Sequence, residues 1–129
     1  MTPKNLFFIA CLCSALSVIL GAFGAHGLKA LITPEQLQTF EIGVRYQFYH
    51  SFALFCAAFI WDKYGSDLAR IAAYLFMGGM LCFCGSLYLL ANRFWLGVEA
   101  WTWLGPITPL GGMLFIAAWG CLAAACKTK

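Results

Sequence analysis

The sequence predicts an all-α, polytopic membrane protein: a bundle of four transmembrane helices joined by short loops. Of its 129 residues, 63% are apolar and only 10% are charged, and the mean hydropathy is +0.83. A soluble domain of this size buries only about two-thirds of its unfolded surface, so it could not cover this much apolar surface. Four helices of about 20 residues each use most of the chain. We therefore expect a single four-span domain over residues 1–129, with no second, soluble domain.

The first predicted span covers residues 6–26. The run from Leu6 to Ala25 is uncharged and long enough to cross a bilayer. A cleavable signal peptide is the competing interpretation, because Lys4, an apolar stretch and the small residues Ala22 and Gly24 loosely resemble a cleavage pattern. We favour a retained span because the apolar stretch is longer than the core of a usual signal peptide.

The second predicted span covers residues 41–61 and is polar in its first third. A helix is expected to begin at Pro34, because Thr33 can serve as its N-cap. A full crossing must then carry the polar run 45–47 inside the membrane. The span ends at residues 61–63, an interfacial tryptophan followed by two charges.

The third predicted span, residues 70–91, is the clearest, because it is uncharged after its first residue. Residues 94–104 contain three tryptophans, so we expect them to lie at the membrane surface. The fourth span covers residues 107–126. We expect regular helix there only from Leu110, because Pro109 lacks an N–H and disfavours helical dihedral angles at the preceding residue.

An even number of spans places both termini on the same side of the membrane. That side and the loop between spans two and three carry five basic residues, against three on the other side. This excess predicts cytoplasmic termini. The five are Lys4, Lys63, Arg70, Lys127 and Lys129, and the three are Lys29, Arg45 and Arg93.

Charge and cysteine content argue against several functional classes. Eight basic and five acidic residues are too few and too scattered for a nucleic-acid surface. The seven cysteines contain no CxxC motif and lie in or at the ends of apolar runs. We expect them to be small buried hydrophobic side chains and not metal ligands. The sequence implies no metal and no cofactor.

Lipid supplies no hydrophobic force between helices, so helices associate where small residues let their backbones approach. Small residues recur at helical spacing in spans one, three and four. We expect close helix contact at these positions, and not a catalytic or conducting role. The glycines concerned are Gly21, Gly24, Gly78, Gly85, Gly112 and Gly120.

Polar residues collect toward one membrane face. Span one ends where span two begins, and span three ends where span four begins, so the residues near both junctions share one layer. A polar side chain at this depth needs a partner or a wet cavity, and intramembrane ionisable residues are candidates for function. The candidate ligand-binding residues are His26, Glu41, Arg45, Tyr46, Gln47, His50, Ser86, Tyr88, Asn92 and Thr108.

His50 is the leading candidate because it lies within hydrocarbon depth. Its structural alternative is a neutral imidazole bonded to Gln47, to Tyr46 or to a neighbouring helix. Arg45 can instead pair with Glu41, four residues earlier on the same helix, or extend toward the headgroups. For His26 the alternative is an ordinary interfacial polar residue.

Four separated motifs resemble those of a known family. They are GAFGAHG at Gly21–Gly27, FEIGVRYQFYH at Phe40–His50, GSLY at Gly85–Tyr88 and GPITPLGG at Gly105–Gly112. The chain is similar to the YgdD-like inner-membrane proteins, grouped as domain of unknown function 423 or uncharacterised family 0382, with eukaryotic relatives of the transmembrane protein 256 type. The resemblance implies a four-span protein of the bacterial cytoplasmic membrane. It implies no activity, substrate or catalytic residue.

Three functional hypotheses remain open. We favour a non-enzymatic membrane protein whose polar layer binds a lipid, a quinone or a partner helix. Membrane lipids are then its expected partners, together with a second copy of the chain or another membrane protein. The first alternative is an oligomeric conduit for ions, protons or small solutes that uses His50. The second is an intramembrane enzyme using His26 or His50 with Glu41, although the sequence contains no HExxH motif, nucleophile elbow or acidic metal cluster.

Overall fold

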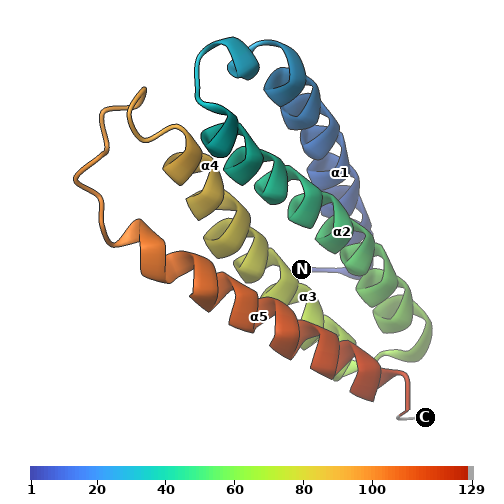
Figure 1. The fold of residues 1–129 in the computed structure, drawn as a ribbon. Helices are drawn as coiled ribbons and strands as arrows, with labels where there is room; N and C mark the ends of the chain where they lie inside the picture. The colour runs from blue at the N-terminus through green and yellow to red at the C-terminus, as the bar shows by residue number, and fades with distance from the viewer. Residues whose placement is uncertain (128–129) are drawn as a thin grey trace.

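The computed structural model describes residues 1–127, and Lys129, which entered the orientation prediction, lies outside them. Every regular element of this part of the chain is helical (Figure 1). The elements are α1 (Pro3–His26), a short 3-10 turn (Leu28–Ala30), α2 (Pro34–Tyr64), α3 (Asp67–Gly79), a π-helical segment (Met80–Cys84), α4 (Gly85–Ala91) and α5 (Leu104–Ala125). Since α3, the π-helical segment and α4 follow one another without a break, the chain forms four antiparallel rods.

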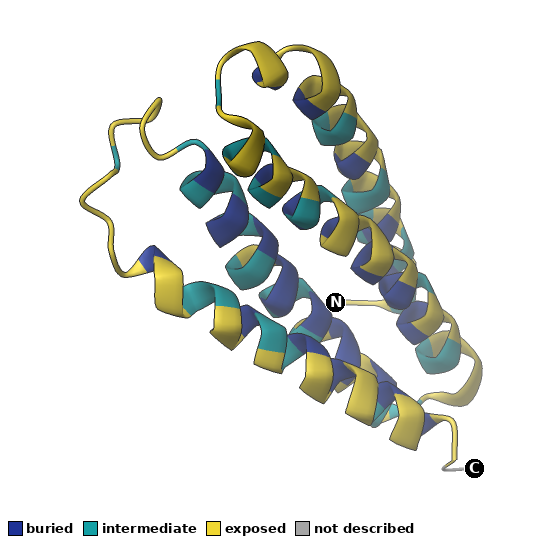
Figure 2. Ribbon diagram, in the orientation of Figure 1, coloured by how far each residue is buried: buried dark blue, intermediate teal, exposed yellow. Residues whose placement is uncertain are grey.

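The rods pack in an open row. The main contacts join α1 to α2, α2 to α3 and α4, and α3 to α5. Buried residues concentrate on the α3 and α4 rod, which lies between α2 and α5 (Figure 2). Because α1 packs mainly on α2, it is the least enclosed of the four rods.

The exposed surface is apolar, as expected for a protein that lipid surrounds. Three helical stretches are long and apolar enough to cross a membrane: Pro3–Ala30, Asp67–Ala91 and Leu104–Ala125. Leu81 and Ile116 are 78% and 75% exposed, and a soluble monomer rarely exposes so much contiguous apolar surface. The predicted class, an all-α polytopic membrane protein, is therefore confirmed. α2 does not belong to the three stretches, because its first half carries the polar residues noted in the sequence.

Local signals set both ends of α2, and the start lies where the sequence predicts it. Thr33 and Gln36 form a capping box, in which Thr33 Oγ1 accepts from the Gln36 N–H at 3.3 Å and Gln36 Oε1 accepts from the Thr33 N–H at 2.9 Å. The expected start at Pro34 is confirmed. At the other end Gly65 adopts φ 63°, a left-handed conformation that glycine adopts at low cost, and the next helix follows at once.

The expected start of the last helix is wrong. α5 begins at Leu104, and the residues that precede Leu110 are helical, with Pro109 inside the helix. Pro106 lies in the first turn, where the missing N–H would have no partner within the helix. Pro109 lies only one turn further in, so it removes one hydrogen bond near an end that is already incomplete. Packing of the first turns against α4 then outweighs the local preference.

The half of the molecule farthest from the polar layer has an alanine-rich core. Its members come from all four rods and include Ala10, Ala57, Ala73 and Ala118, each fully buried. Such small side chains let the helices approach closely. The cysteines only partly match the expectation of burial. Cys84 is buried, whereas Cys13, Cys82 and Cys121 are half-buried and Cys11, Cys56 and Cys126 are exposed; all seven are free thiols.

The closest helix contacts involve glycines outside the predicted packing set. A Cβ at Gly79 would lie 2.5 Å from the Phe115 ring, and one at Gly43 would lie 2.7 Å from the Tyr88 ring. A Cβ at Gly111 would meet the backbone of Phe83.

The predicted packing glycines divide into two groups. A Cβ at Gly21, Gly24, Gly78 or Gly112 would meet another helix at 3.1–3.9 Å, whereas Gly85 and Gly120 face open space among the described residues. For the last two positions the expectation of close helix contact is corrected.

Candidate functional site

Gln47 joins three rods through its side chain. Its Nε2 donates to the carbonyl oxygen of Cys13 on α1 at 3.1 Å, and its Oε1 accepts from the Tyr88 hydroxyl on α4 at 2.9 Å. Gly43, one turn before Gln47, provides the space in which the Tyr88 ring lies. The side chains of Ser17 and Ser51 bond to backbone carbonyls of this group, at Cys13 and Gln47 respectively. Gln47 is therefore the polar centre of the contact between α1, α2 and α4.

His50 lies one turn further along α2, but it faces α5. Its Nδ1 is 2.6 Å from the Tyr46 carbonyl oxygen, and its Nε2 accepts from the Trp119 indole N–H at 3.4 Å. The imidazole stacks on the Phe115 ring, with centroids 3.5 Å apart and planes at 5°. His50 is only 5% exposed. This geometry is that of a neutral imidazole bonded within the bundle, the structural alternative given for His50 above.

Two further polar contacts lie nearer the end of the bundle at which α4 ends and α5 begins. Ser86 Oγ and Thr108 Oγ1 are 2.6 Å apart and join α4 to the second turn of α5. The side chain of Asn92 donates to the Tyr88 carbonyl oxygen at 2.9 Å and so closes the end of α4. No buried side-chain nitrogen or oxygen lacks a hydrogen-bond partner among residues 1–127.

The remaining candidates, His26, Glu41, Arg45 and Tyr46, are exposed, and the Tyr46 ring lies beside that of Phe83, with centroids 4.8 Å apart. Of the two structural alternatives given for Arg45, the pair with Glu41 does not form, since the single ion pair of the described residues joins Arg70 to Asp67. Both charged side chains instead line a shallow hollow between α1 and α2. The ten candidates therefore do not meet at one point but are divided among three helix interfaces and an exposed edge.

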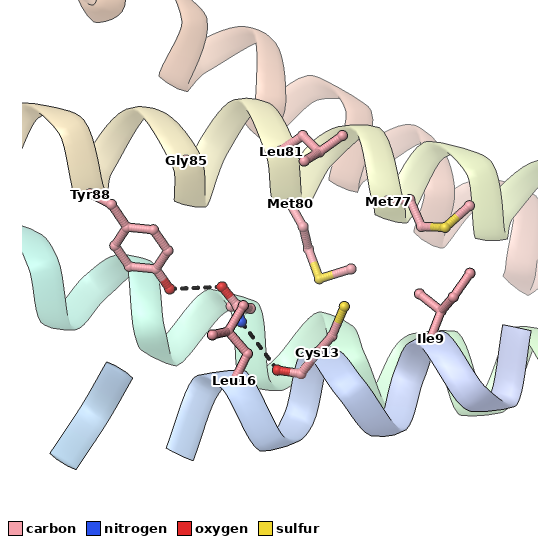
Figure 3. Close-up of a pocket in the computed structure, with 9 residues that line it drawn as sticks. Ile9, Cys13, Leu16, Met77, Met80, Leu81, Gly85 and Tyr88 are labelled. Carbon is pink, nitrogen blue, oxygen red and sulfur yellow. Dashed lines mark hydrogen bonds between the residues drawn. The ribbon is translucent and has the colours of Figure 1, made fainter. Parts of the chain in front are cut away.

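An apolar groove of about 370 Å³ opens beside the Gln47 group (Figure 3). The groove lies between α1, which packs on α2, and the rod formed by α3 and α4. Gln47 and Tyr88 provide its polar atoms, near one end. The other lining residues are Ile9, Cys13, Leu16, Met77, Met80, Leu81 and Gly85.

Sequence reasoning missed the partners that organise these contacts. Phe115 and Trp119, which hold His50, lie four residues apart on α5, and that spacing marks one face of a helix. The π-helical segment gave no recognisable sequence signal, although such segments often occur near functional sites. The pairing of Phe115 and Trp119 with His50 depends on the relative heights of α2 and α5, and the residue spacing within either helix does not give these heights.

The described residues contain no group of three or more histidine, cysteine or acidic side chains that could hold a metal ion. The groups gathered in the bundle are amides, hydroxyls, one imidazole and aromatic rings. Such groups can donate to, accept from and stack on an amphiphilic molecule.

These features define a class: an all-α integral membrane protein whose helices are joined by hydrogen bonds toward one end and by alanine packing toward the other. A family profile described as Protein of unknown function (DUF423) matches residues 20–112. The chain belongs to this family.

Curated relatives extend the likeness over nearly the whole chain. The chain is 41% identical to the UPF0382 membrane protein YwdK of Bacillus subtilis over 90% of both proteins. It is 36% identical to a UPF0382 membrane protein of Haemophilus influenzae over 95% of this chain and 93% of that protein. A UPF0382 membrane protein of Staphylococcus haemolyticus is 37% identical over 90% of this chain. No solved structure matches.

Proposed function

We propose that this protein is a non-enzymatic protein of the bacterial inner membrane that holds one acyl chain of a membrane lipid in the groove between α1 and the α3 and α4 rod. In this proposal all four rods cross the bilayer, α2 included, with both termini cytoplasmic. The observation that carries the proposal is the groove itself, an apolar trough with two polar side chains near one end.

The shape and lining of the groove fit a hydrocarbon chain. Its volume of about 370 Å³ lies in the lower part of the range of small-molecule sites, roughly 300–1,000 Å³. Met77 and Met80 line it, and unbranched thioether side chains adapt to a flexible ligand. Two of its lining residues, Leu16 and Leu81, are exposed on the apolar surface, so lipid tails can reach the groove.

A partner helix fits the groove less well than a lipid chain does. Helices that associate in membranes meet over small residues, whereas bulky side chains such as Leu16, Leu81 and Met77 line this groove. Gly85 is its one small residue apart from Cys13.

The polar end of the groove suits the carbonyl group of a lipid ester. An amide nitrogen has two N–H groups, and that of Gln47 uses one of them for the Cys13 carbonyl oxygen. The Tyr88 hydroxyl donates to Gln47, and its oxygen keeps acceptor capacity. The second Gln47 N–H can therefore donate to an ester carbonyl while the lipid chain extends toward Ile9 and Met77.

The conduit hypothesis fits this geometry less well. Proton or ion passage needs polar groups that continue through the membrane. His50 already uses both ring nitrogens in contacts within the bundle. Beyond it, the buried core is apolar and includes Ala57, Ala73 and Phe76.

Photo-crosslinking with a phospholipid that carries a diazirine on its acyl chain tests the lipid proposal. Purified full-length protein is reconstituted in vesicles containing this lipid, irradiated and mapped by peptide mass spectrometry. We expect enriched crosslinks at Met77, Met80 and Leu81 relative to Ile116, which is exposed on α5.

The matched variants are Gly85→Leu and Gly120→Leu. Both glycines face open space, but only Gly85 lines the groove. A leucine at position 85 should fill the groove and remove the enrichment, whereas one at position 120 should leave it intact. Equal crosslinking in wild type and Gly85→Leu would reject the proposal.

A further inference from the structure

α2 carries an exposed stripe whose chemistry changes in order along the helix. Glu41, Arg45, Phe48 and Phe52 follow one another at spacings of four, three and four residues, so they share one face. All four are exposed. From the end of the bundle inward, the stripe presents a carboxylate, a guanidinium group and two phenyl rings, which contact edge to face with centroids 5.1 Å apart.

The two charged residues of this stripe line a hollow of about 280 Å³ at the crossing of α1 and α2. Gly21 and Gly24 form the α1 side, so backbone and not side chain bounds the hollow there. Phe40 and Val44 complete the lining. The hollow shares no lining residue with the apolar groove.

Glu41 and Arg45 stand side by side without pairing. The spacing of four residues would permit an ion pair, yet none forms between them in the described part of the chain. A charge near the hydrocarbon boundary is costly unless it reaches a partner or water. Two neighbouring, opposite and unpaired charges therefore fit a ligand that carries both signs itself.

We propose that this hollow binds the headgroup of a zwitterionic phospholipid with a primary ammonium group, as in phosphatidylethanolamine. Arg45 binds the phosphate, because a guanidinium group forms forked hydrogen bonds to phosphate oxygens. Glu41 accepts hydrogen bonds from the ammonium group. The acyl chains then lie along Phe48 and Phe52.

The order of these groups along α2 matches the order in the lipid. At 1.5 Å per residue, Glu41 lies about 6 Å nearer than Arg45 to the N-terminal end of α2, which is the end at the membrane surface in this proposal. In the covalent structure of the phospholipid the ammonium group likewise follows the phosphate on one side, and the chains are attached on the other. An anionic headgroup would leave Glu41 unpaired, and a quaternary ammonium group offers it no N–H donor.

Lipid titration followed by native mass spectrometry tests this site. The full-length protein is purified in detergent, and phosphatidylethanolamine and phosphatidylglycerol are added separately. The Gly85→Leu variant serves as the background, so that a lipid in the groove does not contribute and either site can fail without the other. We expect tighter binding of phosphatidylethanolamine.

Single charge removals separate the two roles. Glu41→Gln should weaken phosphatidylethanolamine about fivefold, the upper effect of an exposed ion pair, and should not weaken phosphatidylglycerol. Arg45→Gln should weaken both lipids by a similar factor. The matched controls, Glu35→Gln and Arg93→Gln, lie in a different hollow and should change neither.

The site is rejected if the background protein shows no preference between the two lipids. It is also rejected if Glu41→Gln keeps the preference or if the control variants weaken binding equally. Because Glu41 and Arg45 are exposed, their substitution should not prevent folding, and a thermal melt of each variant checks this.

Discussion

Trp119 donates its indole N–H to Nε2 of His50 across 3.4 Å. An indole nitrogen can only donate, so Nε2 of His50 must be the acceptor. The imidazole proton is then on Nδ1, which lies 2.6 Å from the Tyr46 carbonyl oxygen. These two contacts select one neutral tautomer of His50.

We expect ¹⁵N solid-state NMR of the reconstituted protein to show His50 as the neutral Nδ1–H tautomer. In Trp119→Phe the donor to Nε2 is lost, but the Tyr46 carbonyl oxygen still requires a donor at Nδ1, so the same tautomer should persist while the Nε2 resonance shifts. His26, exposed at the end of α1, serves as an internal reference. A dominant Nε2–H signal for His50 in the wild-type protein would contradict the assignment.

Gly111→Ala should destabilise the bundle strongly. A Cβ at this position would lie 2.7 Å from the Phe83 Cβ and 2.8 Å from its Cα, and it would also meet the Phe83 backbone nitrogen. Backbone cannot move aside as a flexible side chain can, so α5 must shift away from the π-helical segment. We expect a loss of about 1–3 kcal/mol in the free energy of unfolding, the usual cost of overpacking, measured by steric trapping in lipid bicelles.

Gly120→Ala is the matched control for that substitution. Gly120 is on the same helix, but no described atom lies within 4 Å of the position that its Cβ would take. The free energy of unfolding should therefore change little or rise slightly, because alanine favours the helix more than glycine does. Equal losses for both variants would show that Phe83 does not limit the approach of α5.

Tyr88→Phe and Gln47→Leu should be energetically coupled. Their side chains share one hydrogen bond of 2.9 Å inside the bundle. A double-mutant cycle on the free energy of unfolding should give a coupling of about 0.6 kcal/mol and at most about 1.7, the range for hydrogen bonds between membrane helices. Tyr88→Phe combined with Thr108→Val should be additive, because Thr108 bonds to Ser86 instead.

Cys126 reports the orientation of the termini. It is exposed directly after α5, whereas the other exposed thiols, Cys11 and Cys56, lie within helices. With cytoplasmic termini, a membrane-impermeant maleimide should label Cys126 in inside-out vesicles and not in right-side-out vesicles. Cys126→Ser should abolish that label. Labelling confined to right-side-out vesicles would reverse the proposed orientation.

Much of the fold could be read from composition and local signals. The start of α2 followed from a threonine and a proline: Thr33 forms the expected cap and Pro34 is the first residue of the helix. The start of α5 could not be predicted in this way, because the local preference at Pro109 disfavours the helix that the structure has from Leu104. The first turns of α5 pack on α4, and this energy is not visible in the sequence around Pro109.

The candidate site was predictable in its residue types but not in its pairing. Spacing placed Gln47 and His50 close together on α2, yet Gln47 bonds toward α1 and α4 while His50 bonds toward α5. A step of three residues leaves the two side chains about 60° apart around the helix, so each can meet a different neighbouring rod. Which neighbour each one meets depends on how the rods are arranged around α2.

By itself, the sequence determined that this chain is helical and embedded in lipid. Apolar content and the length of uncharged runs are properties of the chain alone and do not depend on which helices touch. Only the tertiary structure decided which glycines admit a neighbouring helix, which aromatic rings enclose His50, and that a groove opens beside Gln47. Those features depend on the relative height and rotation of separate helices, and these are set by the packing of all the side chains together.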